Sequence, residues 1–190
     1  MGRWEPNARE RLVRAAVDLF AEQGYEAATV QEIAERAGLT KTTFFRHFSD
    51  KREVLFAGQE THRRILDEAI AGAPATATPL ELVATAIDAL SATFAEDRRE
   101  LAARLRTVIA RHNELQERAV FKRTSLASAM TEALQLRGVP ASTASLAADL
   151  GVRAFHQAFD RWAESSDGPP LTTLTRQALD ELRSTIATLV

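Results

Sequence analysis

Alanine accounts for 35 of the 190 residues of this chain, close to one residue in five, against 8 glycines and 6 prolines. Alanine has the highest helix propensity of the amino acids and no preference for strands. Apolar residues recur at helical spacing through most of the sequence, and no stretch alternates for long enough to propose a β-sheet. The sequence therefore predicts an all-α fold of about nine helices.

Composition and motifs narrow the classes of function. The chain has no cysteine, which excludes disulfides, zinc–thiolate sites, iron–sulfur clusters and thiol catalysis. No apolar stretch approaches the roughly 18 residues that a bilayer-spanning helix needs, and we expect a cytoplasmic protein. Glycine-rich phosphate loops and the Gly-x-Ser-x-Gly and His-Glu-x-x-His motifs are lacking. We therefore expect no metal, no cofactor and no enzymatic activity.

His156 and Asp160 come closest to a catalytic or metal-binding pattern. They stand four apart on one predicted helix, a spacing that would allow both side chains to hold a metal ion. No third ligand is apparent nearby in the sequence. The alternative is a polar network in an interface or in the lining of a cavity, and an enzyme on a helical scaffold would depend on these two residues.

The first third of the chain is predicted to form four helices. An amphipathic first helix ends near Gly24, because glycine suits the position after a helix. Thr29 and Glu32 have the spacing of a capping box, which opens the second helix. Thr40 can cap the third helix, and a fourth helix is predicted over residues 51–71.

The second and third helices are separated by Ala37–Gly38–Leu39, a short connection with glycine where a left-handed conformation is needed. Two short helices joined in this way form a helix-turn-helix. The third helix opens with small polar and basic residues, which suits a recognition helix whose N-terminal residues meet base edges in the DNA major groove. Phe44 and Phe48 are four apart and share one helix face, so we expect them in the core.

The charges of the chain are unevenly distributed. The formal net charge is −2, which by itself argues against nucleic acid as a partner. From Gly38 to Arg52, however, four basic residues face one acidic residue, Asp50, which gives a local net charge of +3. Residues 65–190 hold the acidic excess. A concentrated basic patch is what the neutralisation of DNA phosphates requires.

Residues 8–55 resemble the DNA-binding domain of the tetracycline-repressor (TetR) family of transcriptional regulators. The matching elements are Gly24–Tyr25, Thr29–Val30, Ile33–Ala34, Ala37–Gly38–Leu39–Thr40, Thr43–Phe44–Phe45–Arg46–His47–Phe48 and Lys51. The resemblance implies a DNA-binding domain over residues 1–52 and a helical effector-binding and dimerisation domain over residues 53–190, connected by the predicted helix 51–71. It also implies a homodimer that binds double-stranded DNA at a palindromic operator.

The resemblance also assigns DNA contacts to individual residues. Phosphate contacts fall to Thr29, Thr43, His47 and Lys51. Base contacts fall to Gln31, Lys41, Thr42 and Arg46. Lys51 is expected at a helix N-terminus, where backbone amides add to the attraction for phosphate. Phe45 stands where most relatives have a tyrosine whose hydroxyl contacts a phosphate, and we expect somewhat weaker binding to DNA for that reason.

A cavity in the second domain is implied for a small effector. The candidate lining residues are His62, Leu66, Phe94, Arg104, Val108, His112, Phe121, Ser125 and Met130. The predicted helix near residues 98–111 is rich in arginine, which is either a solvated face or a preference for an anionic effector such as a carboxylate or an acyl thioester. An apolar effector is the other possibility, since such cavities are mostly apolar.

The last two predicted helices carry apolar stripes. The residues that we assign to a dimer interface are Leu150, Phe159, Leu171, Leu174, Ala178, Leu182 and Ile186. One such pair of helices can pack against its own domain, whereas two pairs across a two-fold axis form a four-helix bundle. Dimerisation would also double the number of base pairs that a short recognition helix can read.

We therefore expect a ligand-responsive repressor that binds its operator as a dimer. The main alternative is a helix-turn-helix regulator without a small-molecule effector, controlled by a protein partner or constitutive. An enzyme is a further alternative. An interaction protein that has lost DNA binding is another, with Phe45 as its single hint.

Overall fold

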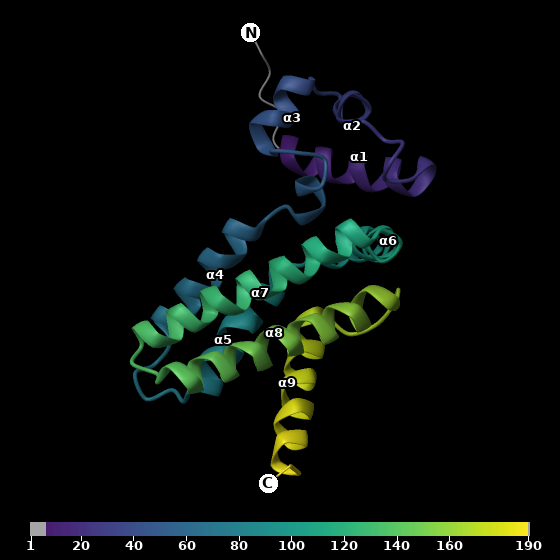
Figure 1. Cartoon of the computed structure of the whole chain (residues 1–190). Coiled ribbons are helices and arrows are strands. Elements are labelled where there is room, and N and C mark those ends of the chain that lie inside the picture. Colours follow the sequence, from purple (N-terminus) through teal and green to yellow (C-terminus); the bar gives the residue numbers. More distant parts are fainter. Residues whose placement is uncertain (1–6, 190) are drawn as a thin grey trace. The chain divides into compact units, whose positions relative to one another are not determined.

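The computed structural model describes residues 7–189, and within this range the chain contains nine α-helices, two short 3₁₀ helices and no strand (Figure 1). The α-helices are α1 (Ala8–Gln23), α2 (Val30–Arg36), α3 (Lys41–His47), α4 (Gln59–Gly72), α5 (Pro79–Ser91), α6 (Arg99–Ala110), α7 (Asn113–Leu136), α8 (Ala141–Glu164) and α9 (Leu171–Ala187). The 3₁₀ helices are η1 (Glu53–Phe56) and η2 (Glu96–Arg98). The predicted all-α class and its nine helices are confirmed.

The chain divides into two compact units. Unit 1 contains residues up to 57 together with residues 101–119, and unit 2 contains residues 58–100 and 120 onward. Unit 1 therefore holds the first three helices, η1, most of α6 and the start of α7. The boundary after residue 52 that we drew from the sequence assigned residues 53–57 and 101–119 to the second domain, whereas they pack with the first.

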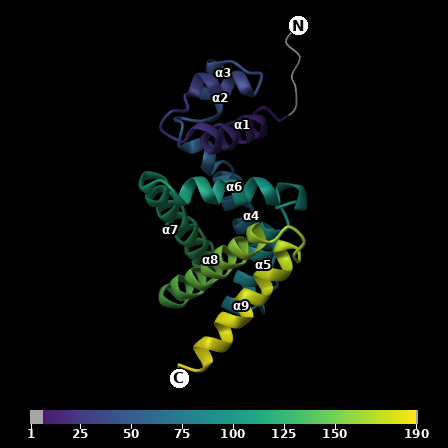
Figure 2. The ribbon, with the colours of Figure 1, turned by 90° about the vertical axis from the view of Figure 1, so that its right-hand side faces the viewer.

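Unit 1 has a continuous apolar core. Leu12 of α1, Ile33 of α2 and Phe44 of α3 are fully buried, so each short helix contributes at least one anchor. Val108 of α6 and Leu115 of α7 belong to the same core. Figure 2 shows α1, α2 and α3 grouped together. Helices of seven residues are too short to be stable alone, and burial of these anchors holds them in place.

The fourth helix differs from the prediction of a helix over residues 51–71. The side chain of Asp50 accepts hydrogen bonds from the amides of Arg52 at 2.8 Å and Glu53 at 3.0 Å, and only the short η1 follows. Gly58 then takes a left-handed conformation with φ +98°, and α4 begins at Gln59. The prediction is wrong for residues 51–58 because the spacing of the apolar residues Val54 and Leu55 fits a 3₁₀ turn as well as an α-helix.

Unit 2 is built around α5, which packs against α4, α8 and α9. Gly151 of α8 permits the close approach of α5, because a Cβ at this position would collide with the side chain of Val83. Trp162 near the end of α8 is fully buried. None of the helices between residues 7 and 189 is long and apolar enough to span a membrane.

Candidate nucleic-acid interface

The entry to α2 is fixed by a complete capping box. The Thr29 hydroxyl oxygen accepts a hydrogen bond from the Glu32 amide at 3.2 Å, and Glu32 Oε2 accepts from the Thr29 amide at 2.8 Å. These hydrogen bonds, with the backbone amide of Thr29 first, lower the pKa of Glu32. The capping box predicted from the sequence is confirmed, and it presents the exposed Thr29 at the start of the helix.

The turn between α2 and α3 needs a glycine. Gly38 has φ +66°, and its amide donates to the Glu35 carbonyl at 2.9 Å while the Leu39 amide donates to the Ala34 carbonyl at 2.8 Å. The Arg11 guanidinium of α1 covers the turn and donates to the Ala37 carbonyl. A Cβ at Gly38 would lie 2.6 Å from Arg11 Nη2, so the turn combines a left-handed backbone with a close approach.

The two faces of α3 have different surroundings. Thr40 caps the helix by accepting from the Thr43 amide at 3.1 Å, as predicted. Phe44 and Phe48 are buried with ring centroids 5.5 Å apart, and the expectation that they belong to the core is confirmed. Phe45 is 49% exposed on the other side of the helix. The packed phenylalanines therefore fix which face of α3 points outward.

The predicted base-contacting residues all lie on the outside of unit 1. Gln31, Lys41, Thr42 and Arg46 are exposed. The amide of Gln31 is hydrogen-bonded to Glu35 in the same helix, whereas Lys41 and Arg46 make no ion pair within the described residues. The two cations at opposite ends of a seven-residue helix leave the outer face of α3 polar and basic. Such a face suits contact with DNA.

Among the predicted phosphate contacts, Thr43 and His47 are half-buried. Burial, followed by the positive charges of Arg46 and Arg9, lowers the pKa of His47. The buried Nε2 atom of His47 has no hydrogen-bond partner within residues 7–189. The phosphate contacts of Thr43 and His47 stay predictions.

Lys51 lies in different surroundings from those we expected. Its ammonium donates to the carbonyl oxygens of Tyr25 at 2.6 Å and Ala28 at 3.0 Å, and it stands 4.2 Å from the centroid of the Tyr25 ring. The residue is not at the N-terminus of an α-helix, because α4 begins only at Gln59. That part of the prediction is wrong, and Lys51 ties the loop after α1 to the end of the helix-turn-helix. Its contact with phosphate stays a prediction.

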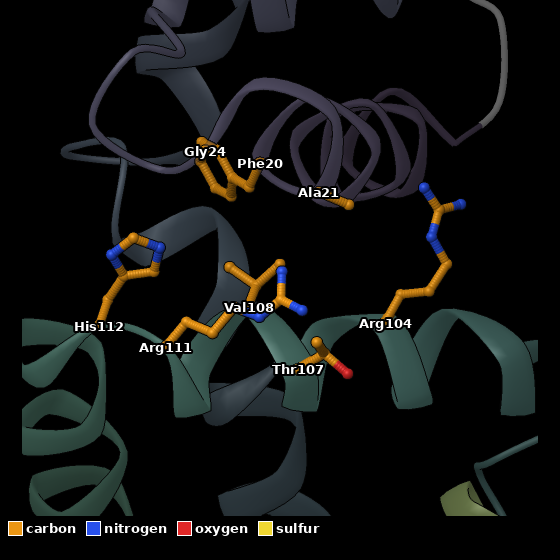
Figure 3. Close-up of a pocket in the computed structure, with 8 residues that line it drawn as sticks. All are labelled: Phe20, Ala21, Gly24, Arg104, Thr107, Val108, Arg111 and His112. Carbon is orange, nitrogen blue, oxygen red and sulfur yellow. The ribbon is translucent and has the colours of Figure 1, made fainter.

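The nine effector-pocket candidates divide between the two units. Arg104, Val108 and His112 line a cleft within unit 1 between α1 and α6 (Figure 3). Arg104 also forms an ion pair with Asp18 of α1 at 2.7 Å. The cleft is also lined by residues that we did not predict from the sequence, namely Phe20, Ala21, Gly24, Thr107 and Arg111. Arg111 could have been found, because it belongs to the arginine-rich segment already noted in the sequence.

The remaining six candidates belong to unit 2. Leu66 and Met130 are fully buried, so they are core residues. His62 lies against Phe94, with ring centroids 5.7 Å apart. Phe121 is 58% exposed, and the hydroxyl of Ser125 donates to the Phe121 carbonyl one turn earlier in α7. Their part in effector binding stays a prediction.

His156 is the most strongly perturbed histidine. Burial, followed by the charge of Arg123, lowers its pKa to about 3, and its Nε2 atom has no partner within the described residues. No three histidine, aspartate or glutamate side chains between residues 7 and 189 come together as metal ligands. His156 therefore acts as a neutral, buried side chain in unit 2.

The residues predicted to form a dimer interface differ in how far they are buried. Leu171, Leu174 and Ala178 are buried within unit 2 itself, as expected for helices that pack against their own domain, and their part in a dimer interface stays a prediction. They are buried because α9 packs its first turns against α5 and α8. Leu150, Phe159 and Leu182 are half-buried and Ile186 is 36% exposed. Leu150, Leu182 and Ile186 line an apolar groove of about 320 Å³, together with Leu146, which is 61% exposed.

An N-terminal helix-turn-helix with a basic outer face, in an all-helical chain, defines a protein of the helix-turn-helix class. Residues 12–57 match the model of the tetR family of bacterial regulatory proteins. The transcriptional regulator TcmR of Streptomyces glaucescens is 41% identical over 86 residues, which cover 43% of this chain and 36% of that protein. Residues 12–57 are thus similar to the DNA-binding part of tetR-family regulators. The matching part spans about a third of the length of TcmR.

Solved structures extend the likeness of the fold to both units. The FadR repressor of Thermus thermophilus, solved with lauroyl-CoA, has a TM-score of 0.54 and 24% identity, and the match covers 90% of this chain and 91% of that one. FadR of Bacillus subtilis, solved with stearoyl-CoA, has a TM-score of 0.57 and 22% identity, and covers 90% and 95%. Over about nine tenths of the chain, the fold thus resembles that of these two regulators.

Proposed function

We propose that the chain is a transcriptional regulator that binds DNA in the cytoplasm by placing α3 in the major groove. The observation that carries the proposal is the contrast between the two faces of α3. Phe44 and Phe48 fix one face in the core, and Lys41, Thr42 and Arg46 are exposed on the other. A short helix with polar and basic residues held outward is suited to reading base edges. We propose no catalytic role, because the binding of DNA by this face of α3 involves no chemical reaction.

The proposed regulator acts as a homodimer on a palindromic operator. A helix of seven residues is only about 10 Å long and can reach few base pairs, so a second half-site adds most of the specificity. The groove lined by Leu146, Leu150, Leu182 and Ile186 is apolar and exposed. A second copy of the same face would cover it by forming a four-helix bundle from α8 and α9.

We further propose that the chain is a repressor released by a small effector. Support comes from the Thermus FadR structure, a repressor of the same fold that contains lauroyl-CoA. The proposal keeps a DNA-binding domain over residues 1–52 and an effector-binding and dimerisation domain over residues 53–190, of which residues 53–57 and 101–119 pack with the DNA-binding domain. The second candidate function is a regulator that answers to a protein partner or is constitutive. The cleft of unit 1, at about 230 Å³, is smaller than the pockets that hold drug-sized ligands, which speaks against a large effector such as an acyl thioester at this place.

The experiment that tests DNA binding is the selection of bound genomic fragments by the full chain at stated salt. A palindromic sequence should be enriched, and Lys41→Ala should relax the preference at one base position in each half-site. Arg153→Ala, an exposed charge on α8, is the matched control and should leave the selected sequence unchanged. Recovery of fragments without a shared sequence would refute the proposed function.

A further inference from the structure

Besides the outer face of α3, unit 1 has a cleft that is large enough to hold a small ligand. It lies between the C-terminal part of α1 and α6, and its volume is about 230 Å³. Figure 3 shows Arg104 and Arg111 on the α6 side, with Phe20 and Ala21 of α1 across from them. Pockets for drug-sized ligands measure about 300–1,000 Å³, so this cleft fits a smaller molecule.

The charges of the cleft leave one guanidinium available. Arg104 is neutralised by its ion pair with Asp18 at 2.7 Å. Arg111 is exposed, and its side chain makes no hydrogen bond or ion pair with the part of the chain that the structure describes. An arginine presents a planar fork of donors that matches a carboxylate in a bidentate arrangement. Arg111 is therefore the group on which an anion would be held.

The backbone amides of Gly24 and His112, which also line the cleft, are not available to bind an anion. The amide of Gly24 donates to the Phe20 carbonyl at 3.1 Å, and that of His112 donates to the Ile109 carbonyl at 3.2 Å. Both α1 and α6 also present their carbonyl ends here, which carry partial negative charge. Attraction of an anion to the cleft thus depends on side chains, and Arg111 carries most of it.

The other side of the cleft is apolar. Phe20 is 3% exposed and Val108 is 4% exposed, so they form a floor that is part of the core of unit 1. A bare inorganic anion would gain nothing from such a floor, whereas a molecule with a short apolar body would cover it. The combination of one free guanidinium and an apolar floor selects for a carboxylate attached to a small hydrocarbon group.

We propose that this cleft binds a small carboxylate, with its carboxylate on Arg111 and its apolar body against Phe20 and Val108. The site lies in the same unit as α3, so its ligand contacts α1 directly within the DNA-binding part of the chain. An effect of this ligand on DNA binding rests on the proposed function, whereas ligand binding itself can be measured without DNA.

The test is isothermal titration calorimetry of the full chain with benzoate, its neutral counterpart benzamide and inorganic phosphate. Benzoate should bind at least about tenfold more tightly than either of the others, because charge and apolar body are both needed. Equal binding of benzamide would refute the role of Arg111. Equal binding of phosphate would refute the apolar body, and no heat from benzoate at millimolar concentration would refute the site.

Two variants separate the contributions. Arg111→Gln should weaken benzoate binding by at least about tenfold, while Arg14→Gln, an exposed arginine on α1, should leave it unchanged. Ala21→Leu keeps the guanidinium but fills the cleft from an exposed position on α1, and it should abolish binding. Unchanged affinity in either Arg111→Gln or Ala21→Leu would overturn the proposal. If the unliganded chain binds no operator, the proposed function is refuted, whereas the measured affinity for benzoate is unaffected.

Discussion

Both units combine local helix caps with long-range side-chain contacts, but in unit 2 two guanidinium groups each bind four backbone carbonyls. In unit 1, Thr29 and Thr40 cap α2 and α3 through residues three positions away. In unit 2, the buried Arg99 reaches across 63 to 70 residues of sequence to hold the end of α8 and the loop before α9. Its acceptors are the carbonyls of Trp162, Ser165, Gly168 and Pro169.

A second arginine in unit 2 acts in the same manner. Arg137, at the end of α7, donates to the carbonyls of Ile70, Ala71, Ala73 and Pro74, which follow or end α4. Helix C-termini leave carbonyls without partners inside the helix, and a guanidinium can satisfy several at once. The caps of Thr29 and Thr40 leave the outer face of α3 free for a partner, and in unit 2 Arg99 and Arg137 join segments that are distant in the sequence.

Removal of Arg99 should have the largest effect on stability. Arg99→Ala leaves several carbonyls near the end of α8 without their donor, and we expect a loss of about 3 kcal/mol in the free energy of unfolding. Urea unfolding followed by circular dichroism measures it. Arg98→Ala, at the exposed neighbouring position, is the control. Equal losses in the two variants would remove the distinction between long-range and local stabilisation.

Acid should weaken unit 2 through His156. The pKa of this residue is about 3 in the folded chain and 6.5 in an unfolded one, so the unfolded state takes up the proton first as the pH falls. The contribution is fully present above pH 6.5 and is lost toward pH 3. Between pH 7 and about pH 4.5, unfolding measurements should show a loss of about 2–3 kcal/mol that His156→Gln largely removes. The same loss in both proteins would contradict this.

A substitution in the glycine turn of unit 1 should reduce the free energy of unfolding by less than the loss of Arg99 does. Gly38→Ala places a Cβ on a backbone with φ +66° and against Arg11, and we expect a loss of about 1–2 kcal/mol in the free energy of unfolding. Gly24→Ala is a useful comparison, because its φ is +87° but no atom lies within 4 Å of the added Cβ. If the close approach matters, Gly38→Ala should cost more than Gly24→Ala in the same unfolding experiment.

A single local cap should have the smallest effect. Thr29→Ala removes one acceptor at the start of α2, which typically costs about 1 kcal/mol. Thr29→Ser keeps the acceptor and serves as the control. Thermal unfolding of the two variants should therefore separate by a few degrees, and a loss for Thr29→Ala as large as that for Arg99→Ala would abolish the contrast between the units.

The sequence was sufficient where structure depends on neighbouring residues. The caps at Thr29 and Thr40, the glycine turn and the burial of Phe44 and Phe48 all follow from spacings of three or four residues. The exposure of Lys41 and Arg46 follows in turn from the buried phenylalanines. Local signals thus predicted most of the candidate interface.

The sequence was insufficient where distant segments decide. Lys51 was assigned to phosphate, yet its ammonium lies among carbonyls of the loop after α1, and no local pattern reports that loop's position. The apolar stripe that holds Leu171 and Leu174 is compatible with packing on the own domain or with a dimer interface, and the sequence does not show that α5 and α8 cover these two residues. The cleft in unit 1 also depends on α6 packing beside α1 from some 80 residues away, which periodicity cannot show.

The central claim is that the outer face of α3 contacts DNA, and the most direct test is the affinity of the full chain for its selected operator. Fluorescence anisotropy at fixed salt should show that Arg46→Ala weakens binding by about 1–3 kcal/mol, while Arg153→Ala in unit 2 leaves it unchanged. Equal affinity of Arg46→Ala and the unaltered chain would contradict the account.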